Sequence, residues 1–164
     1  MMITTGRLVL RELEETDWPA VLEYQSDLRY LRYYEWTHRT EQDVRKFVRL
    51  LVALREERPR TKFQLAITLP TDGQLIGNCG IRMKAVGARE ADIGYELDPR
   101  YWGRGYATEA ARAILAFGFG DLGLHRIWAW CVAENSGSVH VLEKIGMRQE
   151  GRLREQEWQA RARG

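Results

Sequence analysis

A glycine-bearing junction between a strand and a helix, residues 93–110, constrains the fold more than any other part of this sequence. Asp98 and Pro99 end the strand, because proline has no N–H to donate to a sheet ladder. Gly103 and Gly105 follow, and a helix is predicted to begin directly after them. Glycine lets a ligand approach the backbone closely, and the first turn of a helix carries unpaired N–H groups with partial positive charge. The junction therefore predicts either a phosphate-binding loop or an ordinary tight turn between the two elements.

The two commonest nucleotide-binding loops do not fit this junction. A P-loop needs a lysine followed by serine or threonine after its last glycine, and this loop has neither. A dinucleotide-binding loop needs a third glycine within an early strand–helix–strand unit, whereas four predicted strands precede this loop. The loop therefore belongs to neither of these two folds.

Hydrophobic periodicity predicts the remaining elements. Three antiparallel strands in succession, followed by a strand–helix–strand unit, indicate a mixed, mostly antiparallel sheet with helices on both faces. We expect a single α+β domain over residues 1–164. The predicted strands are residues 7–13, 63–69, 74–83, 91–97, 125–132 and 150–158, and the predicted helices begin near Thr16, Thr40, Gly105 and Ser138.

Composition excludes several classes of protein. A balance of 25 basic against 23 acidic residues is small for a protein that binds nucleic acid by neutralising phosphates. Cys79 and Cys131 are isolated and lack the spacing of a metal site. No apolar stretch approaches the ~18 residues of a membrane span, and the N-terminus lacks the apolar segment of a signal peptide. We expect a cytoplasmic protein without a membrane, nucleic-acid or metal partner, in which four arginines form a solvated tail: Arg152, Arg154, Arg161 and Arg163.

A second segment carries a more specific motif. A predicted strand is followed by Asn135-x-x-Ser138, a short helix and Gly146. Together with the loop at residues 101–110, this segment resembles the GNAT acyltransferase superfamily, and within it the branch of ribosomal-protein N-terminal acetyltransferases; residues 5–11 also fit the first strand of that branch. The resemblance covers almost the whole chain. It implies a three-layer α/β/α sandwich whose sheet splays apart between the fourth and fifth predicted strands.

The resemblance implies acetyl-CoA as the cosubstrate and no metal. Loop amides would bind the diphosphate, and the pantetheine arm would run along the exposed edge of strand 91–97. Trp102 stands where the family usually has glutamine or arginine, so the basic contact is either absent or supplied by Arg104 or Arg100. Asn135 would bind the pantetheine arm, cap the next helix, or do both. The cofactor residues implied in this way are Tyr95, Leu97, Trp102, Gly103, Arg104, Gly105, Tyr106, Ala107, Thr108, Asn135 and Ser138.

The implied reaction is direct attack of a neutral amine on the thioester. An α-amino group titrates near pH 8, so about a tenth is neutral at pH 7, and a thiol with a pKa of ~8.5 leaves as thiolate at a cost of about 2 kcal/mol. A strong general acid is therefore optional. Leu142 stands where many members place a tyrosine donor, so Ser138 is the implied donor, unless it only caps the helix. Glu157 is the implied base, unless it is a solvated strand residue, and Glu96 is the second candidate.

An aromatic cluster lies between the first two predicted helices, where this fold binds the acceptor. The cluster is either a wall of the acceptor site or part of the core. Fold and cofactor loop are shared by enzymes with different acceptors, so a peptide N-terminus and a small-molecule amine both stay open. The candidate substrate residues are Tyr33, Tyr34, Trp36 and His38.

The end of the chain departs from the family pattern. Members normally have one more strand after the one that carries Glu157, but residues 158–164 give no further strand signal. Either the final strand is short or missing, or residues 150–158 occupy its place. Because an unpaired edge invites a second chain, we expect a homodimer through the C-terminal sheet edge or a rearranged C-terminus. The departure also leaves a non-catalytic acyl-CoA-binding module as the alternative function.

Overall fold

One mixed sheet runs through the computed structural model, which describes residues 1–34, 38–132, 135–153 and 157–163. Its strands are β1 (Met2–Thr4), β2 (Val9–Glu12), β3 (Lys62–Thr68), β4 (Leu75–Met83), β5 (Glu90–Leu97), β6 (Arg126–Val132), β7 (Arg148–Leu153) and β8 (Glu157–Arg163). They are ordered β1-β2-β3-β4-β5-β6-β8-β7 across the sheet. Only β5 and β6 pair in parallel, and the other described pairs are antiparallel, as the sequence predicts.

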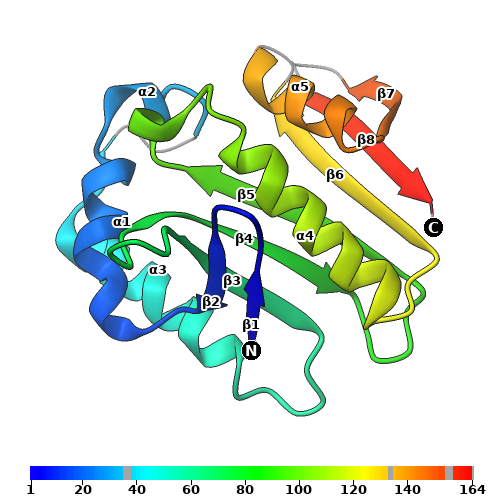
Figure 1. The fold of residues 1–164 in the computed structure, drawn as a ribbon, viewed down its shortest axis with the longest axis horizontal. Helices are drawn as coiled ribbons and strands as arrows, with labels where there is room; N and C mark the ends of the chain where they lie inside the picture. The colour runs from blue at the N-terminus through cyan, green and yellow to red at the C-terminus, as the bar shows by residue number, and fades with distance from the viewer. Residues whose placement is uncertain (35–37, 133–134, 154–156, 164) are drawn as a thin grey trace.

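Helices cover both faces of this sheet (Figure 1). They are α1 (Trp18–Gln25), α2 (Leu28–Leu31), α3 (Glu41–Leu54), α4 (Tyr106–Gly120) and α5 (Ser136–Lys144), with two 3₁₀ turns, η1 (Glu15–Asp17) and η2 (Pro99–Tyr101). The helices α1 and α3 lie on one face, and α4 and α5 lie on the other. This is the three-layer α/β/α arrangement that the family resemblance implied. No described helix is long and apolar enough to cross a membrane.

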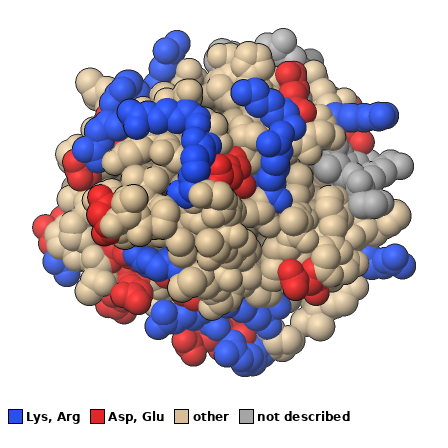
Figure 2. Space-filling model, viewed as in Figure 1, with Lys and Arg blue, Asp and Glu red and all other residues tan. Residues whose placement is uncertain are grey.

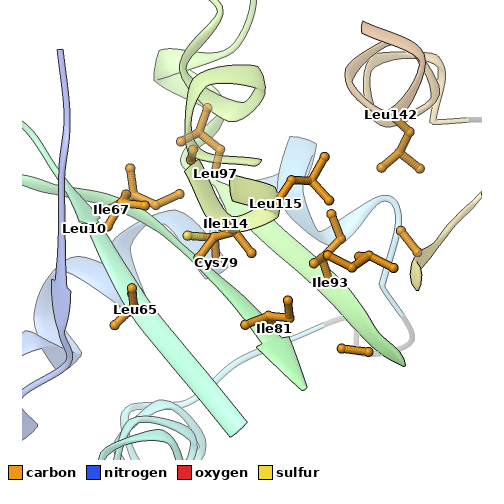
Figure 3. Close-up of a cluster of buried hydrophobic side chains, with 14 of the residues drawn as sticks. Leu10, Leu65, Ile67, Cys79, Ile81, Ile93, Leu97, Ile114, Leu115 and Leu142 are labelled. Carbon is orange, nitrogen blue, oxygen red and sulfur yellow. The ribbon is translucent and has the colours of Figure 1, made fainter. Parts of the chain in front are cut away.

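Two hydrophobic clusters hold the layers together, because alternate residues of a strand point to opposite faces. The cluster between the sheet and α4 includes Leu65, Ile67, Ile81, Ile93, Ile114 and Leu115 (Figure 3). The cluster against α1 and α3 includes Val21, Val44, Val48, Ala66 and Leu75. Gly118 lets α4 lie close to the sheet, because a Cβ there would come within 2.6 Å of Ile81 Cδ1.

The parallel ladder between β5 and β6 ends early. It runs from the pair Glu90–Arg126 to the pair Ile93–Ala129, although β5 continues to Leu97 and β6 to Val132. Beyond Ile93 the two strands diverge, while β5 stays paired with β4 and β6 stays paired with β8. The predicted splay between strands 91–97 and 125–132 is therefore confirmed, and it opens a cleft at the carboxyl ends of both strands.

The C-terminal prediction is wrong. In place of one strand at residues 150–158, the chain forms β7 and then β8, and β8 inserts between β6 and β7. Its ladder with β6 runs from Val132–Glu157 to Arg126–Arg163, so the final strand is present and the edge proposed for a dimer is occupied. The sequence signal is weak because Trp158, Ala160 and Ala162 alternate with charged and polar residues, and alanine adds little hydrophobicity.

Smaller differences lie near the N-terminus. The predicted strand 7–13 is β2, and β1 precedes it and pairs Met2 with Arg11. The helix α2 was also not predicted. The predicted helix start near Thr40 is confirmed, and a capping box forms there: Thr40 Oγ1 accepts from the Asp43 N–H at 3.1 Å, and Asp43 Oδ2 accepts from the Thr40 N–H at 2.9 Å.

Leu115→Ala is expected to lower the free energy of unfolding by about 3 kcal/mol, because it removes buried methyl groups and leaves a cavity under α4. Leu115 is 7% exposed, whereas Leu50 on α3 is 60% exposed. The matched change Leu50→Ala is expected to alter stability by less than about 0.5 kcal/mol. Urea unfolding followed by circular dichroism measures both variants. Equal losses would contradict the packing of α4 on the sheet.

Candidate functional site

Two cavities occupy the cleft between β5 and β6. The loop cavity, of about 420 Å³, extends from Glu96 past residues 101–103, 105–108 and 135–138 to Lys144. The strand cavity, of about 500 Å³, is lined by the diverging strands at residues 93–95 and 129–131. The two share five lining residues and so form one continuous cleft: Tyr33, Tyr34, Tyr95, Asn135 and Ser138.

The predicted phosphate loop forms one end of the loop cavity. Gly103 has φ +74° and Gly105 has φ +81°, a left-handed conformation that strongly favours glycine. Gly105 is the N-cap of α4, and no side chain caps this helix among the described residues. The N–H groups of the first turn are therefore left for solvent or a ligand, and the helix dipole favours an anion there.

The predicted cofactor residues gather around this cavity. All of them except Arg104 line it. Arg104 is exposed, and its guanidinium lies 5.5 Å from the centre of the Tyr101 ring. Arg100 binds the Asp98 carboxylate at 2.7 Å and Glu23 at 3.0 Å, so its charge is already paired. Neither arginine is among the residues that line the loop cavity.

Trp102, at that basic position, has a structural contact instead. Its indole Nε1–H donates to the Leu97 carbonyl at 2.9 Å, which ties the loop to the end of β5. Asp98 also fixes the loop, because its carboxylate accepts from the Arg100 N–H at 3.0 Å and caps η2. The position of the loop relative to the strand is therefore set by side chains that flank the glycines.

Residues of α5 close the other side of the cleft. Asn135 Oδ1 accepts from the Ser138 N–H at 3.1 Å, so Asn135 is the N-cap of α5, one of the two roles considered for it, and Ser138 is not the cap. The Tyr95 hydroxyl donates to the Ser138 carbonyl at 3.2 Å and bridges β5 to α5. Burial raises the pKa of Tyr95, which keeps this donor protonated. The Ser138 hydroxyl makes no hydrogen bond to any described residue and lines both cavities.

Glu96 is the most highly hydrogen-bonded acidic side chain of the cleft. Its Oε1 accepts from the Tyr24 hydroxyl at 2.5 Å, the Gln25 amide at 2.9 Å and the Asn78 amide at 2.6 Å. Its Oε2 accepts from the Tyr30 hydroxyl at 2.8 Å. These four donors fix the orientation of the carboxylate. Only one of them occupies Oε2, so this oxygen can accept a further proton donor.

The sequence explains how these donors reach Glu96. Asn78 is its direct partner in the β4–β5 ladder, and Gln64 of β3 donates to Asn78 Oδ1 at 2.7 Å, which orients the amide. Tyr24 lies on α1 and Tyr30 on α2. Burial is the main cause that raises the pKa of both phenols, and the negative charge of the nearby Glu96 carboxylate raises it further. Both phenols therefore stay protonated donors.

Aromatic side chains line the strand cavity. Tyr33 and Tyr34 both line it, and Tyr34 stacks on Tyr30 with ring centres 4.2 Å apart. Trp130, which the sequence reasoning missed, also lines it and is 44% exposed. A signal was present, because Trp130 and Trp128 are two apart on a strand and therefore share one face.

Three predicted site residues are not found among those that line the cleft. Trp36 lies outside the described residues. His38 is exposed and lines neither cavity of the cleft. Glu157 is the first residue of β8, opposite Val132, and its side chain lies outside the description, so its role stays a prediction. His140 also lines the loop cavity. Among the described residues, no three His, Cys, Asp or Glu side chains form a group that could hold a metal ion.

Comparison with known proteins places this site in a family. A family model described as an acetyltransferase (GNAT) domain matches residues 7–148. An uncharacterized N-acetyltransferase of Bacillus subtilis (strain 168), YnaD, is 40% identical over 151 residues, covering 92% of this chain and 85% of that protein. A GNAT-family acetyltransferase from Bacillus anthracis has a crystal structure with a TM-score of 0.84 and 34% identity, covering 99% and 98% of the two chains. Mycobacterium smegmatis RimJ in complex with CoA-disulfide is 26% identical, with a TM-score of 0.80 and 96% and 82% coverage.

The thiol of Cys131 in the strand cavity is expected to react slowly at neutral pH. Burial raises its pKa to about 11, against ~8.5 for a free cysteine, and only the thiolate is alkylated. Its reaction rate with iodoacetamide should therefore still be rising at about pH 10 in the folded protein. In urea the rate should be half-maximal near pH 8.5 and should level off by about pH 10. Peptide mass spectrometry separates Cys131 from Cys79, and a folded-state rate that is half-maximal near pH 8.5 would contradict the burial.

Proposed function

Because the protein belongs to the acetyltransferase (GNAT) family, we propose that it transfers the acetyl group of acetyl-CoA to a primary amine. The acceptor is the α-amine of a peptide or protein N-terminus, or the amine of a small molecule. One observation carries the proposal: the uncapped start of α4, Ser138 and Glu96 all line the same cavity. An anion-binding helix end, a free hydroxyl and an oriented carboxylate are the groups that this reaction needs.

The residues present fit acetyl-CoA. The backbone from Gly103 to Ala107 would hold the diphosphate, since the two glycines have positive φ and the first turn of α4 has no side-chain cap. The splayed edge of β5 beside Tyr95 would hold the pantetheine arm, and Asn135 would fix the neighbouring start of α5. The group supplies an acetyl thioester that an amine can attack directly. RimJ from Mycobacterium smegmatis, which was solved with CoA-disulfide, supports this choice of cofactor.

Glu96 is the proposed base. An attacking amine must lose its proton, and about a tenth of an α-amine is already neutral at pH 7. Glu96 Oε2 takes the proton from the remaining ammonium, while the donors on Oε1 keep the carboxylate in place. Glu157 stays the alternative base.

Ser138 is the proposed donor to the leaving sulfur. Releasing a thiolate with a pKa of ~8.5 costs about 2 kcal/mol at pH 7, and one hydrogen bond to the departing sulfur is strong enough to offset that cost. The Ser138 hydroxyl has no other partner among the described residues, and Leu142, at the position of the usual tyrosine, is buried and apolar. The non-catalytic alternative depended on a missing strand, and the presence of β8 removes that support.

Calorimetric titration with acetyl-CoA is expected to give micromolar binding. Thiol release should then occur with one class of amine in a panel of peptides, polyamines, amino acids and aminoglycosides. Ser138→Ala should lower kcat about tenfold, the value of one hydrogen bond to the departing charge. Ser26→Ala, at the exposed residue that follows α1 and lines neither cavity, is the matched control and should leave kcat unchanged. Absence of acetyl-CoA binding by the wild type would overturn the proposed function.

Glu96→Gln is expected to lower kcat for an α-amine about tenfold at pH 7, since it removes the base and leaves only the neutral tenth of the amine to react. Its residual activity should rise with pH up to the pKa of the amine, because only the amine that is already neutral then reacts. Glu90→Gln, at the other end of β5 and paired with Arg126 at 3.2 Å, is the control. Rates across pH 6–9 test this, with acetyl-CoA binding as the check on folding. If Glu157→Gln shows this pH profile and Glu96→Gln does not, Glu157 is the base.

A further inference from the structure

The turn between β1 and β2 contacts the phosphate loop and α4, about 100 residues away in sequence (Figure 1). Arg7 Nε donates to Glu109 Oε1 at 2.8 Å, and the Arg7 backbone N–H donates to Glu109 Oε2 at 2.8 Å. The Thr5 hydroxyl donates to the same Oε2 at 2.5 Å. A second nitrogen of the guanidinium, Nη1, donates to the carbonyl of Arg104 at 2.9 Å.

We propose that Arg7 is a positioning residue that fixes the backbone of the diphosphate loop for acetyl-CoA. In a trans peptide the C=O and the following N–H point in opposite directions. Holding the Arg104 carbonyl toward Arg7 therefore directs the Gly105 N–H away from Arg7. This inference rests on the proposed acetyl-CoA activity, and Arg7 itself need not touch the cofactor.

The loop needs such a restraint because of its glycines. Gly103 and Gly105 flank Arg104, and glycine has more backbone freedom than any other residue. A loop that must be ordered on binding loses affinity for each restrained torsion, and a preorganised loop avoids that loss. Arg7 is placed to supply this order, since a Cβ on Gly105 would lie 3.2 Å from Arg7 Nη2.

Glu109 anchors the arginine and is neutralised by it. Glu109 lies in the first turn of α4, where an unpaired carboxylate would repel a bound diphosphate. Burial opposes its ionisation, but hydrogen bonds from Thr5 and Arg7 hold its pKa below the usual range. The guanidinium also lies 4.5 Å from the centre of the Tyr106 ring, which limits its movement.

Arg7 differs from the other basic residues on this face in the hydrogen bonds that it makes, not in its charge alone. Figure 2 shows basic side chains on both sides of acidic ones where α4 begins. Arg112 and Lys144 line the same shallow surface pocket as Arg7 and Glu109, so positive charge is supplied more than once. Arg7 alone among these bases bridges the α4 carboxylate and the loop carbonyl in the described structure. Lysine cannot do so with the same fork of donors.

The test compares ligands with and without the diphosphate. Arg7→Ala should weaken CoA binding about tenfold in calorimetry and raise KM for acetyl-CoA to a similar extent, with kcat unchanged. The affinity for pantetheine and the kcat/KM for S-acetylpantetheine, which both lack the diphosphate, should stay as in the wild type. Arg7→Lys should behave like Arg7→Ala. Glu109→Gln, which keeps the shape of the side chain but not its charge, should weaken CoA binding by less than Arg7→Ala does. It should leave pantetheine binding unchanged.

Arg45→Ala is the matched control. Arg45 is 42% exposed against 48% for Arg7, pairs with Glu41 at 2.8 Å, and lies 4.1 Å from the Trp18 ring centre, on the opposite face of the sheet. It should leave CoA binding unchanged. Equal losses for CoA and pantetheine in Arg7→Ala, or full rescue by lysine, would overturn the positioning role. If wild-type protein binds no CoA, the proposed function fails instead.

Discussion

The functional cleft depends on the early end of the parallel ladder between β5 and β6. Four residue pairs hold these strands together, after which they diverge. Each strand remains paired along its other edge, β5 with β4 as far as Leu97 and β6 with β8 as far as Val132. Beyond Ile93 the facing backbone groups of β5 and β6 are not paired with each other, and among the described residues the Leu97 carbonyl accepts from the Trp102 indole instead. Unpaired backbone groups strongly favour an extended, amide-rich ligand.

The connection between these two strands also positions the start of α4. Parallel neighbours need a crossover, and α4 is that crossover. A crossover helix begins beside the carboxyl end of the strand that precedes it, so the start of α4 lies at the mouth of the cleft (Figure 1). One topological feature thus brings together the open strand edges and the positive end of a helix, and the glycines of the loop only need to leave that end uncapped.

The sequence predicted the parts of the site that are local. The strand end, the two glycines, the helix after them and the Asn135 cap are each contained within a few residues, where turn and capping chemistry act. It did not predict β8, whose alternating apolar residues in the sequence are mostly alanine, nor the donors to Glu96. Tyr24 and Tyr30 are 72 and 66 residues from Glu96, and only the packing of α1 and α2 on the sheet brings them near. A single sequence carries no signal for such pairs.

The alternation of β5 explains how two kinds of chemistry meet at one site. Successive side chains of a strand point to opposite faces, so Leu97 packs in the cluster beneath α4 while Glu96 contacts residues of α1 and α2 on the other face. In a continuous sheet these two faces would be separated by the backbone. Because the ladder ends at Ile93, the cleft connects them, and Glu96 lines the same cavity as the loop glycines. A shift of one residue in β5 would move Glu96 and Leu97 each to the opposite face of the sheet. The β4–β5 register, with Asn78 opposite Glu96, is therefore as important to the site as the loop itself.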